Sequence, residues 1–229
     1  MSLRHFRFGA LIRAVAYGAL ALAGCLALLI LVYAVTPPVS TLMLGRLVVG
    51  KSYQRTYVRL RDIAPVLVAS VIASEDARFC QNDGVEWGTL EQVVDEAGPH
   101  GPRRGASTIT MQTAKNLFLW PGRSALRKGI EIPIALVLGL VWSKAHTIEV
   151  YLNVAEWGDG VFGIEAASQR YFHKDANRLD AREAALLATA LPNPIKRNPE
   201  TPRVFQLRLA DSIAARTATS SEWLGCLPR

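Results

Sequence analysis

The longest hydrophobic stretch of the chain lies close to its start. No charged residue occurs from position 14 to position 45, and residues 14–35, AVAYGALALAGCLALLILVYAV, are almost entirely apolar. A helix needs about 20 apolar residues to cross a bilayer. The apolar region of a cleaved signal peptide is shorter, roughly 7–15 residues, and ends in a small-residue cleavage site. The pattern therefore predicts a retained transmembrane anchor over residues 14–35.

Three arginines on the N-terminal side of this run predict its orientation. Arg4, Arg7 and Arg13 precede the span, and positively charged flanks favour the cytoplasmic side of a membrane. We therefore expect residues 1–13 in the cytoplasm. These arginines supply +3 of the formal net charge of +7, so the remainder carries +4. This mild bias suits an anionic membrane surface or a phosphate-bearing substrate, and it is too scattered to predict a nucleic-acid partner.

Beyond the span the pattern is mainly helical. Residues 36–60 predict a linker that ends in a short extended piece, because β-branched and aromatic residues gather there. After it, apolar positions recur at helical spacing between capping residues and Gly or Pro breaks, so residues 61–229 predict one mostly α-helical domain. Pro133 is expected to kink or end its helix early. The expected helices cover 63–79, 88–98, 108–120, 125–142, 143–157, 164–172, 180–191 and a last segment after the Pro-rich connection 192–202.

The three cysteines fall in different environments. Cys25 lies in the predicted span and should be a free thiol. Cys80 and Cys226 lie in the exported part, where a disulfide is chemically allowed, but the sequence leaves their pairing open. The cysteines and the four histidines show no metal-ligand spacing, so no zinc site is predicted.

Glu75 is the first candidate for chemistry. It follows VLVASVIAS directly, a segment that must be buried, and acids are poorly placed at the C-terminal end of a helix. One interpretation is a solvated helix end. The other is a carboxylate at the rim of a buried face, whose partial desolvation raises its pKa and makes it a base near neutral pH.

The second candidate is the segment RRGASTITMQTAKNLF at 103–118. On a helix, Thr108, Gln112 and Lys115 share one face at spacings of three and four. Ser107 and Thr108 at the entry predict helix N–H groups that remain open to an anion. The alternative is an ordinary capped surface helix.

The third candidate is a lone acid at the head of a long uncharged run. Arg123, Arg127 and Lys128 precede Glu131, and residues 132–142 carry no charge. A buried carboxylate in that position is costly unless it is paired. The simpler interpretation is a helix ion pair, because Arg127 lies at i−4 and Lys128 at i−3. The functional one is a second active-site acid surrounded by cations.

One motif is set aside. GDGVFG at 158–163 matches G-x-G-x-x-G, which marks a dinucleotide site only within a strand–turn–helix unit. The preceding TIEVYLN predicts a helix, so a dinucleotide site is not expected.

Together these segments resemble the peptidoglycan glycosyltransferases of glycosyltransferase family 51, in their short monofunctional form. The motifs, in the family's order, are EDARF with a following Gly, RRGASTITMQTAKNLF, RKGIE, KAHTIEVYLN and GDGVFGIEAASQRYF. One such motif alone would be weak, but five in the same order over roughly residues 45–215 are specific. No second large domain follows, so a transpeptidase half is not expected.

The resemblance implies a reaction. Members of this family polymerise lipid II in cell-wall biosynthesis. Glu75 matches the general base, which takes the proton from the GlcNAc 4-hydroxyl of the acceptor. That oxygen attacks C1 of the donor MurNAc with inversion, a β-1,4 link forms, and undecaprenyl pyrophosphate leaves. Glu131 matches the second acid, which lies near the leaving pyrophosphate or orients its cationic partners.

The resemblance also implies substrate-binding residues. Lys115 and Arg123 match cations near the diphosphate, where developing negative charge needs fixed positive groups. The other candidates are Arg127 and Lys128 in the same motif, and Ser107, Thr108 and Gln112, which match the GASTI(T/S)QQ face.

Fold, cofactors and partners follow from the same resemblance. It implies a lysozyme-like, mainly α fold with two lobes around a cleft, on the periplasmic side of the cell inner membrane. The sequence requires no cofactor; the family associates a divalent cation, Mg or Mn, with diphosphate chemistry, and Glu75 is the one candidate ligand. Expected partners are lipid II, the nascent glycan strand, the membrane, and proteins of cell-wall synthesis or division.

Three positions depart from the family pattern. Asn82 stands where His is usual, Met111 where a second Gln is usual, and Gly139 where many members have Glu. None of these changes removes a proposed acid or phosphate-binding cation, so activity is expected. Asn82→His is the substitution that would test whether restoring the usual residue raises activity.

Two other functions are considered. A lysozyme-like lytic enzyme also uses two carboxylates around a glycan, but it would not need the cations at 115, 123, 127 and 128. A non-catalytic partner in cell-wall assembly is the other hypothesis, and Asn82 and Met111 are the residues that favour it.

Overall fold

The computed structural model describes residues 2–95, 107–122, 124–218 and 224–228, with the backbone alone for residues 2–11. The chain divides into two compact units, Met1–Pro37 and Pro38–Arg229, which are described separately.

The first unit is a single long helix. α1 spans Ser2–Tyr33, and within it Ile12–Tyr33 forms a 22-residue segment of mean hydropathy 2.5. That segment is long and apolar enough to cross a membrane. The long apolar N-terminal helix predicted over residues 14–35 is therefore confirmed. Cys25 within it is a free cysteine, as expected.

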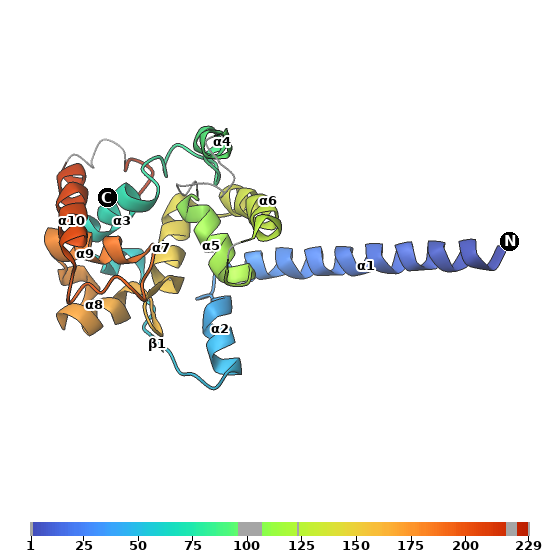
Figure 1. The fold of residues 1–229 in the computed structure, drawn as a ribbon, viewed down its shortest axis with the longest axis horizontal. Coiled ribbons are helices and arrows are strands. Elements are labelled where there is room, and N and C mark those ends of the chain that lie inside the picture. Colours follow the sequence, from blue (N-terminus) through green and yellow to red (C-terminus); the bar gives the residue numbers. More distant parts are fainter. Residues whose placement is uncertain (1, 96–106, 123, 219–223, 229) are drawn as a thin grey trace. The chain divides into compact units, whose positions relative to one another are not determined.

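The second unit is mainly helical, as predicted (Figure 1). A small sheet of order β1-β3-β2 pairs β1 parallel and β2 antiparallel to β3. The elements in chain order are α2 (Thr41–Val48), β1 (Gln54–Arg55), the 3-10 turn η1 (Leu60–Asp62), α3 (Pro65–Glu75), α4 (Trp87–Asp95), α5 (Ile109–Phe118), α6 (Ala125–Val141), α7 (Lys144–Val154), β2 (Glu156–Gly158), β3 (Val161–Phe162), α8 (Ile164–Phe172), the 3-10 turn η2 (Ala176–Arg178), α9 (Ala181–Ala190) and α10 (Val204–Thr217).

Two groups of helices make up this unit. α3 packs against α9 and α10, while α5 packs against α6 and α7, and Figure 1 shows α6 on the opposite side of the unit from α10. α3 is buried on all sides from Leu67 to Ala73, which is typical of a central helix rather than an amphipathic surface helix. The end of α3 at Glu75 therefore emerges from the core.

The segment predicted as a linker differs from the expectation. Residues 41–48 form helix α2, capped by Ser40, whose Oγ accepts a hydrogen bond from the Met43 amide at 3.2 Å. The side chain of Met43 is fully buried, and Thr41 Oγ1 donates to the Asn116 carbonyl at 3.1 Å. This helix was missed because its first residues, TLMLG, continue the uncharged run that begins in the predicted span, and Arg46 is the one charged residue among its eight positions.

Pro133 does not end its helix. α6 continues from Ala125 through Pro133 to Val141. Proline removes one backbone hydrogen bond and crowds the preceding turn, but Ile134, Ala135 and Leu138 are buried beyond it. Packing of this side of α6 on α5 outweighs the local cost of the proline.

The G-x-G-x-x-G segment has no dinucleotide-binding context. It lies in the β2–β3 hairpin between α7 and α8, and Gly160 turns the hairpin with a φ of +71°. The prediction that GDGVFG is not a dinucleotide site agrees with this position, because helix α7, not a strand, precedes the hairpin.

The pairing of Cys80 and Cys226, which the sequence left open, is answered by the structure. Cys80 and Cys226 form a disulfide across a sequence separation of 146, with their Cα atoms 5.5 Å apart. The bond fastens the C-terminal segment beside the turn that follows Glu75.

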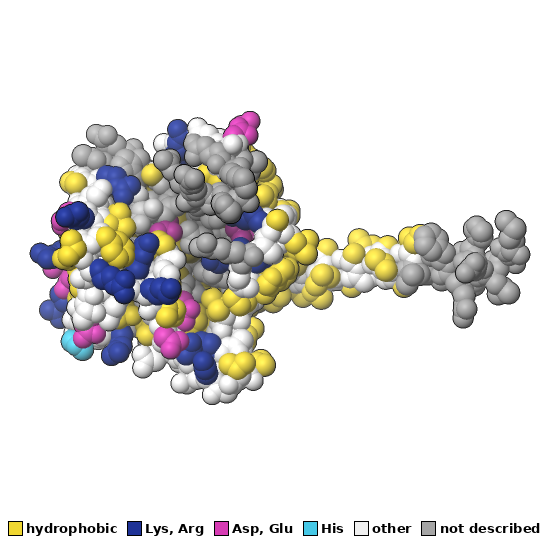
Figure 2. Space-filling view, in the orientation of Figure 1, with side chains coloured by type: hydrophobic (Ala, Val, Ile, Leu, Met, Phe, Trp, Pro, Cys, Tyr) yellow, Lys and Arg dark blue, Asp and Glu magenta, His cyan; other side chains and the backbone are white. Residues whose placement is uncertain are grey.

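The surface of this unit has two characters (Figure 2). Figure 2 shows dark-blue Lys and Arg side chains over the α8 to α10 side, where Arg170, Arg182 and Arg208 are exposed. The α6 side is largely yellow. The exposed apolar side chains of α6 are Leu126, Ile130, Val137, Leu140 and Val141.

Candidate active site

Glu75 ends α3 beside the first turns of α5. Gln112 Nε2 donates a hydrogen bond to Glu75 Oε2 at 2.9 Å, and Ser74 Oγ donates to Oε1 at 3.3 Å. Burial raises the pKa of the Glu75 carboxyl above its ordinary value, while the hydrogen bonds from Gln112 and Ser74 and the charges of Lys115 and Arg197 oppose that rise. A raised pKa makes this carboxylate a better proton acceptor than an exposed glutamate.

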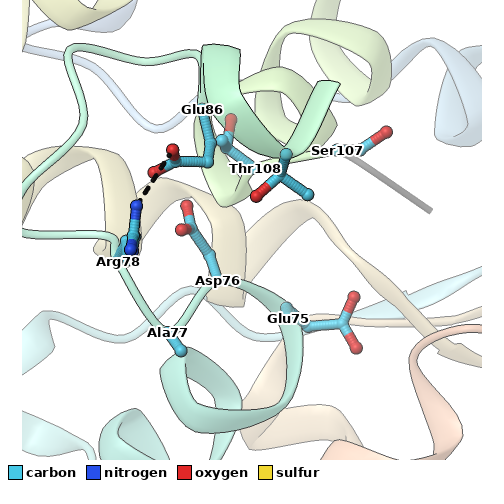
Figure 3. Close-up of a pocket in the computed structure, with 8 residues that line it drawn as sticks. Glu75, Asp76, Ala77, Arg78, Glu86, Ser107 and Thr108 are labelled. Atoms are coloured by element: carbon cyan, nitrogen blue, oxygen red, sulfur yellow. Dashed lines mark hydrogen bonds and ion pairs between the residues drawn. The ribbon is translucent and has the colours of Figure 1, made fainter. Parts of the chain in front are cut away.

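Asp76 has a different task from its neighbour. Its carboxylate accepts a hydrogen bond from the Ile109 amide at 3.0 Å, which places it at the start of α5. Figure 3 shows the side chains of Glu75 and Asp76 pointing in different directions. A carboxylate is favourable at a helix N-terminus. The two neighbouring acids therefore serve different helices. Glu75 is the last residue of α3, and Asp76 accepts a hydrogen bond from the first residue of α5.

A cavity of about 260 Å³ opens beside these acids, where the volume is large enough for several water molecules or one sugar-sized group. Arg78 and Glu86 form an ion pair across it with 3.4 Å between Nη1 and Oε1 (Figure 3). The lining residues are Glu75, Asp76, Ala77, Arg78, Glu86, Thr89, Ser107 and Thr108.

The start of α5 corrects one expectation. Thr108 is the N-cap, and its Oγ1 accepts from the Met111 amide at 3.1 Å and donates to the Gly84 carbonyl at 2.6 Å. Because Asp76 already accepts from the Ile109 amide, these two N–H groups are not open to an anion. Thr108 therefore orders the helix start, while it also lines the cavity.

Gln112 is oriented by a residue that the sequence did not single out. The hydroxyl of Tyr151, buried on α7, donates to Gln112 Oε1 at 3.0 Å. This bond turns the amide so that its N–H groups face Glu75. Tyr151 lies in the KAHTIEVYLN motif, which was the one available signal.

Glu131 sits in a compact ion cluster. It is 1% exposed, forms an ion pair with Arg127 through Nη1, and accepts from Lys128 Nζ at 2.6 Å. Lys128 Nζ also donates to Ser107 Oγ at 2.6 Å, and Arg127 Nε donates to the Gly122 carbonyl at 3.0 Å. The ion pairs predicted at i−4 and i−3 are confirmed, and they leave the carboxylate without an open side.

Lys115 feels the charges of both acids, Glu75 and Glu131. Burial lowers the pKa of its ammonium, the charge of Glu131 opposes this, and the neighbouring cations Arg127 and Lys128 reinforce it. Within the described ranges, no hydrogen-bond partner is found for Lys115 Nζ. Its charge is thus available to a ligand. Arg123, the other predicted diphosphate cation, lies outside the described residues.

Arg197 is a second residue that the sequence did not indicate. It lies on the connection between α9 and α10, where Nη1 donates to the Thr189 carbonyl at 3.0 Å and the guanidinium stacks on Phe205 at 5.5 Å. Its charge helps to lower the pKa of Glu75. No pattern in the Pro-rich segment 192–202 distinguishes it from other basic loop residues.

The donor set does not fit a metal held by the protein alone. In the part of the chain that the structure describes, no group of three or more His, Cys, Asp and Glu side chains could hold an ion. Around Glu75 the neighbours are an amide, a hydroxyl and the cation Lys115. Magnesium and manganese require several oxygen ligands.

Comparison with known proteins identifies the family of the chain. Residues 42–218 match the protein family described as Transglycosylase. The chain is 52% identical over 210 residues to a "Biosynthetic peptidoglycan transglycosylase" of Agrobacterium fabrum, covering 88% of this chain and 93% of that protein. It is 51% identical over 201 residues to the protein of that name in Brucella suis biovar 1, covering 87% and 90%, and 46% identical over 221 residues to that of Nitrobacter hamburgensis, covering 93% and 96%.

The chain therefore belongs to the transglycosylase family, glycosyltransferase family 51. Within that class it is a peptidoglycan glycosyltransferase, an enzyme of cell-wall biosynthesis. The lytic and the non-catalytic interpretations give way to this one.

Proposed function

We propose that this enzyme polymerises lipid II into β-1,4-linked glycan strands, with inversion at MurNAc C1 and release of undecaprenyl pyrophosphate. The observation that carries the proposal is the pairing of Glu75 with Gln112 beside the cation Lys115. A proton acceptor and a phosphate-binding cation are the two groups that this transfer requires.

Glu75 acts as the general base. Its carboxylate takes the proton from the GlcNAc 4-hydroxyl of the acceptor as that oxygen attacks C1 of the donor. Burial raises the pKa of Glu75, so the carboxylate is a better proton acceptor than an exposed glutamate. Gln112 holds the carboxylate through Oε2, which leaves its other oxygen, bonded only to Ser74 at 3.3 Å in the described structure, to face the substrate.

The leaving diphosphate is stabilised by cations on α5 and α6. The C1–O bond to the diphosphate breaks as the new C1–O bond forms, and the electron pair passes to the phosphate oxygen. Lys115 contributes a charge that no described side chain neutralises by direct pairing, and Lys128 contributes a half-buried one. Such fixed positive groups favour the developing charge more than water would.

Glu131 holds cations rather than protons in this scheme. Both of its oxygens are engaged by Arg127 and Lys128, so it fixes their positions for the diphosphate. No step of the proposed reaction passes through a metal ion; a divalent cation in the family's manner would be held mainly by the diphosphate, with Glu75 the candidate ligand from the chain.

The substrate and the enzyme share a membrane. We propose that α1 is a single-pass anchor in the cell inner membrane, with Arg4, Arg7 and Arg13 on the cytoplasmic side and the transglycosylase domain in the periplasm. The exposed apolar side chains of α6, with Leu140 85% exposed, suit contact with lipid and with the polyprenyl tail.

The test is polymerisation of fluorescent lipid II by the full-length protein in detergent micelles and in vesicles. We expect long glycan strands that lysozyme cleaves, since lysozyme requires the β-1,4 link, and release of undecaprenyl pyrophosphate. Shortening of preformed strands without synthesis would favour a lytic enzyme, and inertness where a relative polymerises would favour a non-catalytic role. Either result contradicts the proposal.

A further inference from the structure

A buried polar network lies behind the Glu75 turn, outside the groups that the proposed reaction uses. Asn82, which is 6% exposed, is its centre. Asn82 Nδ2 donates to Asp76 Oδ1 at 3.0 Å and to the Arg78 carbonyl at 3.1 Å. Asn82 Oδ1 accepts from the Gly84 amide at 3.0 Å and from Lys144 Nζ at 3.2 Å. Two donors and two acceptor positions are the full capacity of an amide side chain.

Lys144 holds this network from the start of α7. Besides Asn82 Oδ1, its Nζ donates to the Asn82 backbone carbonyl at 2.5 Å and lies 4.6 Å from the centre of the Phe79 ring. These contacts hold the half-buried ammonium group of Lys144 in a fixed position. It joins α7 to the turn between α3 and α4.

The network ends at the reacting groups. Asp76, held by Asn82, accepts from the Ile109 amide at the first turn of α5. Gln112 lies one turn further along α5 and donates to Glu75, the neighbour of Asp76 in the chain. The end of α3 and the start of α5 are therefore joined by two contacts, Glu75 with Gln112 and Asp76 with the Ile109 amide.

α6 presses on the same turn from another direction. A Cβ atom placed on Gly139 would lie 2.2 Å from the Asp83 carbonyl oxygen, and one on Gly84 would lie 2.5 Å from the Ala135 carbonyl oxygen. Real Cβ atoms do not approach so closely, because hard-sphere overlap forbids it. The turn at residues 82–84 therefore packs directly on α6, the helix that carries Glu131. Asn82 and Gly139, which both differ from the usual family residues, lie on the two sides of this contact.

We propose that Lys144 and Asn82 are positioning residues for the transfer reaction. They fix the Asp76 cap of α5, and through it the distance between the Glu75 base and the cations of α5 and α6. This inference rests on the proposed function. It also reverses the expectation for Asn82→His: a neutral imidazole offers one donor and one acceptor, so it leaves two of the four partners unsatisfied, and activity falls.

The experiment measures kcat and KM for lipid II polymerisation with Lys144→Met, Asn82→His and Gly139→Ala in the full-length enzyme. We expect kcat to fall by about 10- to 100-fold in each, the size of effect that a misplacement near 1 Å produces. KM should change little, and the variants should remain folded with a lowered thermal midpoint, because polar groups lose partners or backbone is displaced. Lys174→Met is the control for Lys144, because Lys174 pairs with Glu183 at 2.8 Å away from these groups. Gly45→Ala is the control for Gly139, because nothing lies within 4 Å of its added Cβ.

A second readout does not depend on catalysis. Hydrogen exchange over residues 107–118 should accelerate in Lys144→Met and Asn82→His, because the Asp76 cap loosens, while exchange over residues 181–190 stays unchanged. A folded Lys144→Met enzyme with the wild-type kcat or with unchanged exchange at 107–118 overturns the inference. Unfolding of Lys144→Met and Gly139→Ala alike would assign a stability role and overturn it as well. An inactive wild-type enzyme with the expected exchange pattern would count against the proposed function alone.

Discussion

Glu75 is a half-buried carboxylate and Glu131 a fully buried one, both near cations, and their surroundings differ in kind. Glu75 meets an amide and a hydroxyl, at 2.9 and 3.3 Å, and feels Lys115 and Arg197 only as charges. Glu131 is clamped directly by Arg127 and Lys128. Neutral donors leave the Glu75 carboxylate able to gain a proton, whereas Glu131 holds two cations in place. This difference supports the proposal that Glu75 is the base and that Glu131 positions its cationic partners.

The largest expected effect comes from neutralising the base. Glu75→Gln should lower kcat by about 10³-fold, the usual scale for a general base. The folded protein should become slightly more stable at neutral pH, because the raised pKa of Glu75 means that its ionised form opposes folding above the pKa of the unfolded chain. Polymerisation rate and thermal midpoint are the measurements.

Glu200→Gln is the matched control for Glu75→Gln, since Glu200 is exposed and should leave both quantities unchanged. Retention of most activity in Glu75→Gln would refute the assignment of the base.

The opposite pattern is expected at the second acid. Glu131→Gln leaves the buried Arg127 and the half-buried Lys128 without their anion, which should lower the free energy of unfolding by about 3 kcal/mol and the thermal midpoint by about 6–12 °C. Activity should fall by about 10²-fold as the cations move.

Glu183→Gln is the comparison for this change, because its pair with Lys174 is half-exposed and should contribute no more than about 1 kcal/mol. If Glu131→Gln melts with the wild type, the cluster does not stabilise the fold and the contrast between the two acids fails.

The pH dependence sharpens the comparison further. Because burial raises the pKa of Glu75, kcat/KM should be lost as pH falls through a midpoint above the ordinary glutamate value of 4.5. Gln112→Leu removes a hydrogen bond that favours the carboxylate, so the midpoint should move to higher pH. The same profile with Gln169→Leu, a surface amide, should match the wild type; a midpoint that moves downward in Gln112→Leu would contradict the role of the amide.

The smallest effect on kcat is expected from Tyr151, which contacts Gln112 and not the substrate. Tyr151→Phe removes the hydroxyl that orients Gln112, which should lower kcat about fivefold for the loss of one hydrogen bond near 1 kcal/mol. Tyr171→Phe removes a comparable hydroxyl, bonded to the Trp157 carbonyl at 3.2 Å, and should not change the rate. Equal rates for the two variants would show that Gln112 is oriented without Tyr151.

Local features of the fold were predictable from the sequence. The helix start at Thr108 and the spacing of Arg127 and Lys128 to Glu131 depend on residues within one or two turns of each other. Capping and i,i+4 pairing act over that range, so they can be predicted from one amino-acid sequence. The helix expected over 63–79 is shorter in the structure, because α3 ends at Glu75.

Features that join distant segments were not predictable. Tyr151 reaches Gln112 across 39 positions and Lys144 reaches Asn82 across 62, and no local pattern encodes such pairs. Asp76 shows the same limit: the amide that it accepts from, at the start of α5, lies 33 residues further on, so no local pattern marks its role. α2 was missed for another reason, since its first residues, TLMLG, continue the uncharged run of the predicted span.

The Cys80–Cys226 bond has a consequence for how the enzyme matures. Because Cys226 lies 146 positions after Cys80, the ribosome must synthesise almost all of the transglycosylase domain before the bond can form. A nascent chain therefore carries the turn after Glu75 without this bond until Cys226 has been added, and the bond then forms only under oxidising conditions. The disulfide therefore forms late in maturation, and it fixes the turn beside Glu75 only after the helices around that turn have been synthesised.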